Sequence, residues 1–171
     1  MSAPDLVSIR PAASDDVTAI ADIYNHYVLA STVTFEESVL GEAEMAGRVR
    51  DVSDAGLPWL VAVQARRVVG YAYATPWRGR SAYRYSVEVS GYVDPGFQRA
   101  GAGSQLYRAL IYELVVLGKH SAIAVITLPN PASAAFHEKL GFAKMAHLKQ
   151  IGFKFGRWLD VGYWQRLLDD G

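Results

Sequence analysis

A segment with the sequence Q-R-A-G-A-G fills residues 98–103, where a strand-like pattern ends and a helix-like pattern begins. Glycine lowers helix propensity by up to about 1 kcal/mol per residue, so Gly101 and Gly103 need a reason to stand at a helix start. Main-chain amides at a helix N-terminus bind phosphates with help from the helix dipole, and a residue without Cβ lets the phosphates come close. The segment therefore predicts a pyrophosphate site, to which Arg99 would add a charge-assisted contact. On these six residues alone, a plain loop before a helix is an equally good interpretation.

Three known phosphate-binding patterns can be matched against this segment. The Walker pattern needs a lysine directly after its second glycine, and none follows Gly103. The dinucleotide fingerprint G-x-G-x-x-G needs a third glycine where Leu106 stands. The pattern Q/R-x-x-G-x-G/A, placed between a strand and a helix, fits Gln98, Gly101 and Gly103. The segment is thus a candidate for that third type of anion site.

The composition is that of an ordinary globular protein, and it excludes several classes of function. The 171 residues carry 17 basic and 17 acidic side chains, and this balance argues against nucleic-acid binding. Cysteine is absent, which excludes disulfides, thiolate metal sites and cysteine nucleophiles. The opening M-S-A-P-D-L lacks a signal-peptide pattern, and no apolar run approaches the roughly 18 residues of a membrane helix. We expect one domain over residues 1–171, in the cytoplasm, with no metal and no membrane contact.

The periodicity of apolar residues predicts a mixed α/β arrangement in the order β-α-α-β-β-β-α-β-α-β-β. Strands are expected at residues 7–10, 59–64, 68–75, 83–93, 121–127, 143–153 and 157–167. Helices are expected from a cap at Ser14 through Val28, and over residues 41–54, 104–117 and 132–140. Residues 31–38 lack a helical period and predict a loop. In the third helix the residues expected to face the core are Leu106, Leu110, Leu114 and Leu117.

A second motif, N-P-A-S-A-A-F-H-E-K-L-G-F at residues 130–142, gives the first one a context. Together the two segments resemble the GCN5-related N-acetyltransferases (GNAT), which carry Q/R-x-x-G-x-G/A and then, roughly thirty residues later, N-x-x-[AS]-x-x-[LF]-Y-x-K-x-G-F. The resemblance extends over the whole chain and is closest to the branch of phosphinothricin and methionine sulfoximine acetyltransferases. The features shared with that branch are I-R-P-A, I-Y-N-H-Y, V-T-F-E, P-W-R-G-R-S-A-Y-R-Y and G-F-K-F-G-R-W-L-D-V-G-Y-W.

The resemblance implies a single-domain α/β GNAT fold: a mixed, mostly antiparallel sheet, flanked by helices, whose parallel fourth and fifth strands splay apart. In such enzymes acetyl-CoA lies in the wedge between these strands. The main chain around Tyr92 and Val93 would pair with the pantetheine arm like an added strand. The residues implied for the pyrophosphate are Gln98, Arg99, Ala100, Gly101, Ala102, Gly103 and Ser104, and those for the lower pantetheine are Asn130 and Ser133. Taken alone, Asn130 is better interpreted as a turn residue before Pro131.

Glu88 is the catalytic base that the resemblance implies. It would remove a proton from the acceptor amine, which is mostly protonated at neutral pH. A carboxylate with a pKa near about 4.3 is a poor base for this task unless burial raises its pKa or a water relays the proton. A solvated strand face is the alternative, because Arg84, Ser86, Glu88 and Ser90 share one parity. Gly91, in the same strand, is expected to mark a bulge that opens the wedge and frees an amide for the thioester oxygen.

His137 stands where most GNAT enzymes carry a tyrosine thought to protonate the departing thiolate. In having a histidine at this position, the chain resembles the phosphinothricin-like branch. A neutral histidine must gain a proton before it can donate one, and a pKa near about 6.5 permits this near neutral pH. The alternative interpretation is an exposed polar residue beside buried Ala135 and Phe136.

The loop before the fourth strand carries the side chains expected to bind the acceptor, namely Trp77, Arg78, Arg80 and Tyr83. Two arginines suit the carboxylate of an amino acid, although an exposed basic loop tip is the alternative. Phe35 and Glu36, in V-T-F-E, resemble the substrate lid of the branch. The branch is usually dimeric through its C-terminal strands, and the aromatic residues between 153 and 164 fit such an interface and internal packing equally well.

These features favour direct acetyl transfer from acetyl-CoA to the α-amine of a small amino acid or analogue, in a homodimer. One alternative keeps the fold but changes the acceptor to a polyamine, an aminoglycoside or a protein N-terminus. Arg78 and Arg80 disfavour such cationic acceptors. A second alternative is a non-catalytic acyl-CoA-binding module, which the presence of Glu88 and His137 disfavours.

Overall fold

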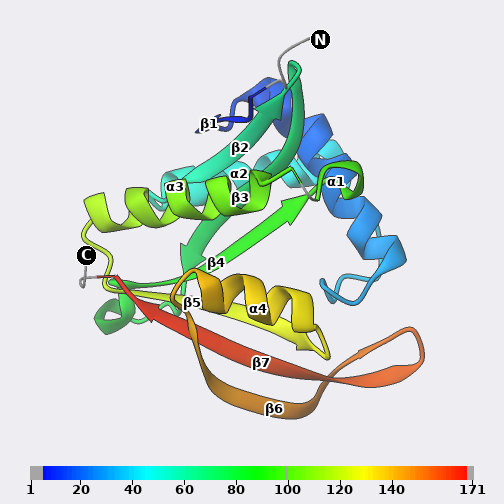
Figure 1. Cartoon of the computed structure of the whole chain (residues 1–171), viewed down its shortest axis with the longest axis vertical. Helices are drawn as coiled ribbons and strands as arrows, with labels where there is room; N and C mark the ends of the chain where they lie inside the picture. The colour runs from blue at the N-terminus through cyan, green and yellow to red at the C-terminus, as the bar shows by residue number, and fades with distance from the viewer. Residues whose placement is uncertain (1–5, 99, 169–171) are drawn as a thin grey trace.

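One mixed sheet organises the protein, and helices cover both of its faces (Figure 1). The structure, a computed structural model, describes residues 6–98 and 100–168. Arg99, expected at the pyrophosphate, lies outside the described residues. The strands are β1 (Ser8–Pro11), β2 (Trp59–Gln64), β3 (Arg67–Pro76), β4 (Ser86–Val93), β5 (Ser121–Leu128), β6 (Ala143–Lys154) and β7 (Arg157–Leu167). The helices are α1 (Val17–Ala30), α2 (Glu42–Asp54), α3 (Ala102–Val116) and α4 (Pro131–Lys139).

The strands are ordered β1-β2-β3-β4-β5-β7-β6 across the sheet. Every neighbouring pair is antiparallel except β4 and β5, which run parallel because α3 crosses between them. The chain order of strands and helices is the predicted one. The fold is therefore the mixed, mostly antiparallel α/β sheet with one parallel central pair that the sequence predicts.

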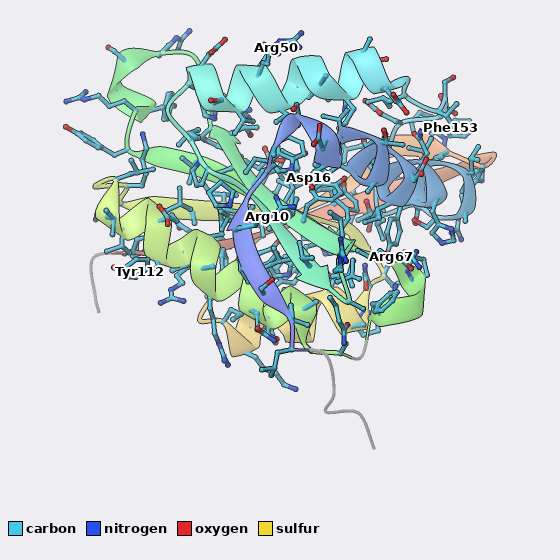
Figure 2. The ribbon with its side chains drawn as sticks, turned by 90° about the horizontal axis from the view of Figure 1, so that it is seen from above. Arg10, Asp16, Arg50, Arg67, Tyr112 and Phe153 are labelled. Carbon is cyan, nitrogen blue, oxygen red and sulfur yellow. The ribbon has the colours of Figure 1, made fainter. Side chains whose placement is uncertain are left out.

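The two faces of the sheet carry different helices, as the view from above shows (Figure 2). α3 packs on β3 and β2 while α4 packs on β5, and both lie on one side. α1 and α2 pack on β2, β3 and β4 from the other side. Alternate residues of β4 divide between these faces: Val93 contacts the turn of α3, whereas Tyr92 packs on the α1 tyrosines. A residue of β4 is thus assigned to a face by its parity.

The parallel pair separates after a short ladder. β4 pairs with β5 only from Ser86 opposite Ser121 to Glu88 opposite Ile123. Beyond that point β4 continues along β3 to Val93, and β5 continues along β7 to Leu128. The strands therefore enclose the predicted wedge, and Glu88 stands at its apex.

Gly91 does not mark a bulge, contrary to the prediction. The register of β3 and β4 is unbroken from Gly70 opposite Val93 to Pro76 opposite Val87. A Cβ at position 91 would lie 2.6 Å from the ring of Tyr107 in α3. Glycine is needed here because that aromatic ring crosses directly over the strand.

Three other predicted details differ from the structure. Ser14 does not cap α1, because residues 14–16 form a 3-10 turn in which the Asp16 carboxylate accepts from the Ala13 amide (2.7 Å) and from Arg10. The strand expected from Tyr83 begins at Ser86, since Ser81–Tyr83 is a 3-10 turn. α3 begins at Ala102 and ends at Val116, which leaves Leu117 half exposed instead of facing the core.

The described helices are too short or too polar to cross a membrane.

Candidate active site

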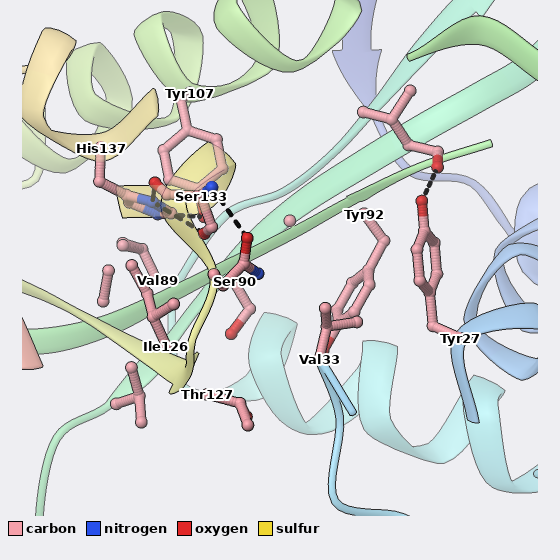
Figure 3. A pocket seen from close by; sticks show the side chains of 15 residues that line it. Tyr27, Val33, Val89, Ser90, Tyr92, Tyr107, Ile126, Thr127, Ser133 and His137 are labelled. Carbon is pink, nitrogen blue, oxygen red and sulfur yellow. Dashed lines mark hydrogen bonds between the residues drawn. The ribbon is translucent and has the colours of Figure 1, made fainter. Parts of the chain in front are cut away.

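A cavity fills the wedge between β4 and β5 (Figure 3). Its strand walls are residues 89–93 of β4 and 124–127 of β5. Side chains from three helices complete it: Tyr27 of α1, Tyr107 of α3 and His137 of α4. The cavity also brings together five predicted residues that are distant in sequence, Tyr92, Val93, Asn130, Ser133 and His137. A thioester arm threaded through the wedge would contact all three helices.

The main chain of β4 offers the wedge only alternate residues. Trp77 donates to the Ser86 carbonyl (3.2 Å) and Asp94 donates to the Val69 carbonyl (2.8 Å), so the even-numbered residues of β4 face β3. The main-chain groups of Tyr92 therefore pair with β3, and the prediction that they pair with pantetheine is wrong. Gly91 and Val93 turn their main-chain groups toward the wedge.

Tyr27 occupies part of that strand edge. Its hydroxyl donates to the Val93 carbonyl, and the Gln98 side-chain amide donates to the same hydroxyl (3.0 Å). Gln98 thus supports Tyr27 from the phosphate segment, a role that the sequence pattern did not predict. The free strand edge is left chiefly to Gly91 and to the amide of Val93.

The glycine-rich turn has the geometry of an anion cradle. Gly101 has a φ of 78°, a left-handed conformation that favours glycine, and α3 begins at the next residue. The Ala100 amide is already engaged by the Phe97 carbonyl (3.1 Å), and Gln105 donates to the Gly101 carbonyl (3.2 Å). The amides of residues 101–104 lie between these two, at the helix end where a helix has no internal acceptors. The Ala100 amide is therefore not available to an anion, and the amides of residues 101–104 remain as the candidate donors.

Gly103 tests whether this turn is shaped by the protein or by a ligand. A Cβ at position 103 would meet Val93 at 3.5 Å and Phe136 at 3.6 Å, which are ordinary contacts. Internal packing therefore does not require glycine here. A group that lies against the turn from outside does explain the missing side chain, so the residues fit a bound diphosphate.

An ion pair fixes the turn that leads into the cradle. Asp94 accepts from the Gly96 amide (2.9 Å) and from Arg67 of β3 (2.6 Å). The Arg67 guanidinium also lies over the Phe97 ring, 5.3 Å from its centroid. These contacts hold residues 94–97 in place before the cradle, and the sequence motifs had not marked them.

His137 is buried, so its interpretation as an exposed polar residue is wrong; its neighbour Ala135 is the exposed one. The Nδ1 atom lies 2.8 Å from the Ser133 carbonyl oxygen, which can only accept, so Nδ1 carries the proton. The other ring nitrogen, Nε2, lies 3.2 Å from the Tyr107 hydroxyl. Burial lowers the pKa of His137, and the bond to Ser133 only partly opposes this. Neutral His137 therefore accepts a hydrogen bond from Tyr107 and has no proton to donate into the wedge.

Tyr107 is the polar donor that sequence reasoning missed. Its side chain is buried, lines the cavity and packs edge-on against Phe136 and His137. Burial raises the pKa of the phenol far above its usual range, so the hydroxyl keeps its proton. The available signal was a tyrosine at a core-facing helix position, next to Leu106 and one turn before Leu110.

Glu88 lies on the other face of β4. Its cross-strand neighbour in β3 is Thr75, and Ser90 and Tyr92 follow on the same face. The carboxyl is half buried, and this burial raises the pKa of Glu88 while the positive charge of Arg78 lowers it. The alternative of a fully solvated strand face is therefore wrong for this residue. His137 and Glu88 approach the wedge from opposite faces of the sheet.

The predicted acceptor residues fall into two groups. Trp77 packs edge-on against Tyr163 of β7 at 5.9 Å, and Arg78 stacks on the Trp77 ring at 4.4 Å. Arg80 and Tyr83 are exposed on the loop before β4. Phe35 and Glu36 come from the loop after α1, and Glu36 forms an ion pair with Arg48 of α2. Among these residues, Arg78 is the one whose positive charge lowers the pKa of Glu88.

Asn130 has a structural role that the sequence also suggested. Its side-chain oxygen caps α4 by accepting from the Ser133 amide at 3.1 Å. Both residues line the cavity, and Ser133 in addition orients His137 through its carbonyl. Among the described residues, no group of three or more side chains could hold a metal ion.

Comparison with known proteins gives this geometry a family. A model of the acetyltransferase (GNAT) family matches residues 20–142, which is more than half of the chain. The chain belongs to the GNAT family of acetyltransferases, and it is an acetyl-CoA-dependent N-acetyltransferase.

Individual relatives define the branch. The chain is 43% identical over 160 residues to a phosphinothricin N-acetyltransferase of Streptomyces viridochromogenes, covering 94% of this chain and 87% of that protein. It is 38% identical over 164 residues to an L-methionine sulfoximine/L-methionine sulfone acetyltransferase of Salmonella typhimurium, covering 96% of each. A phosphinothricin acetyltransferase of Sinorhizobium meliloti, solved with acetyl-CoA, superposes with a TM-score of 0.93 at 41% identity, covering 96% of this chain and 90% of that one. The predicted branch is thus confirmed.

Proposed function

We propose that this enzyme, acting as one domain, acetylates the α-amine of a small zwitterionic amino acid whose side chain ends in a polar tetrahedral centre, as in phosphinothricin and methionine sulfoximine. The observation that carries the proposal is the position of Glu88, half buried at the apex of the wedge with a raised pKa. Nearby Arg78 and the Glu36–Arg48 pair give this face charges of both signs. Such a face suits an ammonium and a carboxylate together better than a polycation.

The proposed mechanism divides the work between the two faces of the sheet. Acetyl-CoA supplies an activated acetyl thioester. Glu88 takes the proton from the acceptor ammonium, directly or through a water, and its raised pKa makes it a better base than an ordinary carboxylate. The Gly91 amide, turned toward the wedge, donates to the developing oxyanion. The amides of residues 101–104 and the α3 dipole hold the diphosphate.

Tyr107 replaces His137 as the group that attends the leaving sulfur. Its hydroxyl carries a proton and lines the cavity, whereas neutral His137 presents only a lone pair there. Before acetyl transfer this proton is donated to His137 Nε2, so the hydroxyl turns from that nitrogen to the sulfur as the thiolate forms. The new hydrogen bond stabilises the thiolate without a complete proton transfer, which the raised pKa of the phenol disfavours. His137 acts as a positioning residue that orients Tyr107 before the thiolate forms.

We also propose a homodimer, in which a second copy covers the outer face of the β6–β7 hairpin. The large apolar side chains exposed there are Met145, Ile151, Phe153, Phe155 and Trp158, each more than half exposed. Internal packing accounts for Trp164, which is buried, but not for these five. Sedimentation equilibrium tests the dimer, and a Phe153→Glu, Trp158→Glu variant should sediment as a monomer.

We propose the cytoplasm as the compartment, because the enzyme consumes acetyl-CoA and the chain has no cysteine to oxidise.

A thiol-release assay tests the acceptor. The purified enzyme would receive acetyl-CoA with phosphinothricin, methionine sulfoximine, methionine sulfone, unmodified amino acids, spermidine, an aminoglycoside or a peptide. The proposal expects the highest kcat/KM for the first three compounds, and N-acetylated products by mass spectrometry. Preference for spermidine or a peptide would replace the proposed acceptor. If calorimetry shows that CoA binds but no thiol is released from acetyl-CoA with any of these amines, a non-catalytic module is favoured.

A further inference from the structure

A buried lysine fastens the loop after α1 to the C-terminal hairpin. Lys154 of β6 is 1% exposed, and its ammonium donates to the carbonyls of Val28 (2.8 Å), Ser31 (2.8 Å) and Thr34 (2.9 Å). An ammonium has three donors and no acceptor, so these carbonyls satisfy it fully. Two of them lie at the C-terminal end of α1, where the helix dipole favours a cation. Lys154 lies in the shared stretch G-F-K-F-G-R-W-L-D-V-G-Y-W, but neither that resemblance nor the proposed chemistry gives its side chain a role.

A second contact joins the same two segments. Phe35 lies directly against the main chain of Gly152 in β6, where a Cβ would come within 2.3 Å of the phenyl ring. Glycine at 152 is therefore required for the ring to rest on the strand. The hairpin thus holds residues 31–36, the lid segment, at two points: an ammonium under its carbonyls and a flat strand surface under its aromatic ring.

The lid segment forms part of the acceptor side of the wedge. Val33 lines the cavity, and the Thr34 hydroxyl is 2.7 Å from the hydroxyl of Tyr24. The Tyr24 ring packs edge-on against Tyr92 of β4, with 5.3 Å between ring centroids. Glu36, the last residue of the segment, pairs with Arg48 of α2. Lys154 therefore fixes a segment that reaches the cavity wall, through the carbonyls of Ser31 and Thr34.

We propose that Lys154 is a positioning residue for the acceptor: with Gly152, it sets the lid segment so that Phe35 and Glu36 face the bound amino acid. The inference rests on the proposed function, because it assigns the acceptor to this face. On this proposal the β6–β7 hairpin affects acceptor binding by holding the lid segment, without contacting the acceptor itself. The acetyl-CoA cradle is on the opposite face and shares no contact with Lys154 among the described residues.

The first test compares Lys154→Met with Lys149→Met, an exposed lysine of the same strand. In the full chain, Lys154→Met should raise the acceptor KM about tenfold while kcat stays within about threefold, because the catalytic groups remain in place. The Kd of acetyl-CoA by calorimetry and the kinetics of Lys149→Met should stay unchanged. A fall in kcat and in acetyl-CoA affinity together would indicate general loss of structure and would overturn a specific positioning role.

The second test does not depend on whether the lysine variant folds. Gly152→Ala should displace Phe35 and raise the acceptor KM by several-fold, whereas Gly152→Ala added to Phe35→Ala should change it no further. Unchanged acceptor KM in both Lys154→Met and Gly152→Ala, with normal wild-type turnover, would overturn the inference alone. If the wild-type enzyme failed to release thiol from acetyl-CoA with every amino acid tested, the proposed acceptor would be overturned instead.

Discussion

The two faces of the sheet meet at the wedge but are built from different parts of the chain. In the proposed mechanism the α3–α4 face binds acetyl-CoA through main-chain geometry, with a left-handed Gly101, the first amides of α3 and the strand edge at Gly91. The α1–α2 face would act on the acceptor through side chains, chiefly Glu88, Arg78 and the Glu36–Arg48 pair. Main-chain N–H groups stay the same when side chains change, so the α3–α4 face, here called the donor face, suits an acetyl donor that never varies. The α1–α2 face, here called the acceptor face, can be adapted to a new acceptor by a few substitutions.

Replacing Glu88 should have the largest effect of any single change on the acceptor face. Glu88→Gln keeps the shape of the side chain but removes the base, so kcat should fall on the order of 100-fold or more. The Kd of acetyl-CoA should hold within about twofold, since its predicted contacts lie on the other face. Steady-state kinetics and calorimetry measure the two quantities. An equal loss in both would erase the division between the faces, and unchanged turnover across the pH range would remove Glu88 from the mechanism.

Tyr107 provides the corresponding test on the donor face. Tyr107→Phe removes one hydroxyl and leaves the ring over Gly91, so kcat should fall on the order of 10- to 30-fold with little change in either KM. The fall should shrink when the leaving group is a more acidic thiol, because such a thiolate needs less stabilisation. Acetyl transfer from thioesters of graded thiol pKa measures this. If the fall in kcat were the same for every leaving group, the hydroxyl would have no part in stabilising the thiolate and Tyr107 would serve only in packing.

The two glycines of the cradle separate protein geometry from ligand binding. Gly103→Ala should fold normally, because its new methyl group meets only ordinary contacts, yet weaken acetyl-CoA about tenfold, or about 1.4 kcal/mol. Gly101→Ala should instead lower the free energy of unfolding by about 1 kcal/mol, because of its left-handed φ. Calorimetric titration and urea unfolding of both variants give the comparison. Equal affinity of Gly103→Ala and wild type would remove the diphosphate from this turn.

The sequence marks the glycine-rich turn but not the hydrogen-bond pattern of the strand beside it, for a physical reason. A phosphate cradle needs glycines at fixed spacing beside a helix start, so Gln98, Gly101 and Gly103 form a local pattern. Residue types do not show which main-chain groups of a strand face which neighbour, so the sequence does not reveal that Gly91 and Val93, and not Tyr92, face the wedge. Gly91 itself was read as a bulge because the ring that needs its space, Tyr107, comes from another element.

The acceptor face depends on contacts between distant segments, which no local pattern reports. Lys154 reaches carbonyls more than a hundred residues away, and Arg48 reaches Glu36 from the next helix. His137 illustrates the same limit on the donor face: the resemblance implied acid catalysis, but burial lowers its pKa and the Ser133 carbonyl fixes the proton on Nδ1, so Nε2 is an acceptor. Where a tertiary partner sets the protonation state, the residue type alone misleads.

Arg78 offers the finest test of how the acceptor face is tuned. Burial raises the pKa of Glu88 and the charge of Arg78 lowers it, so Arg78→Met should raise the Glu88 pKa further. A base acts only when deprotonated, and activity is lost as the pH falls through its pKa. The acid limb of kcat, measured at saturating acceptor, should therefore move to higher pH, with less than about a twofold change near pH 8. Arg78→Lys keeps the positive charge and should leave the limb in place. A limb that stays fixed in Arg78→Met would mean that Arg78 serves the acceptor carboxylate alone, and a limb that moves to lower pH would contradict Glu88 as the titrating base.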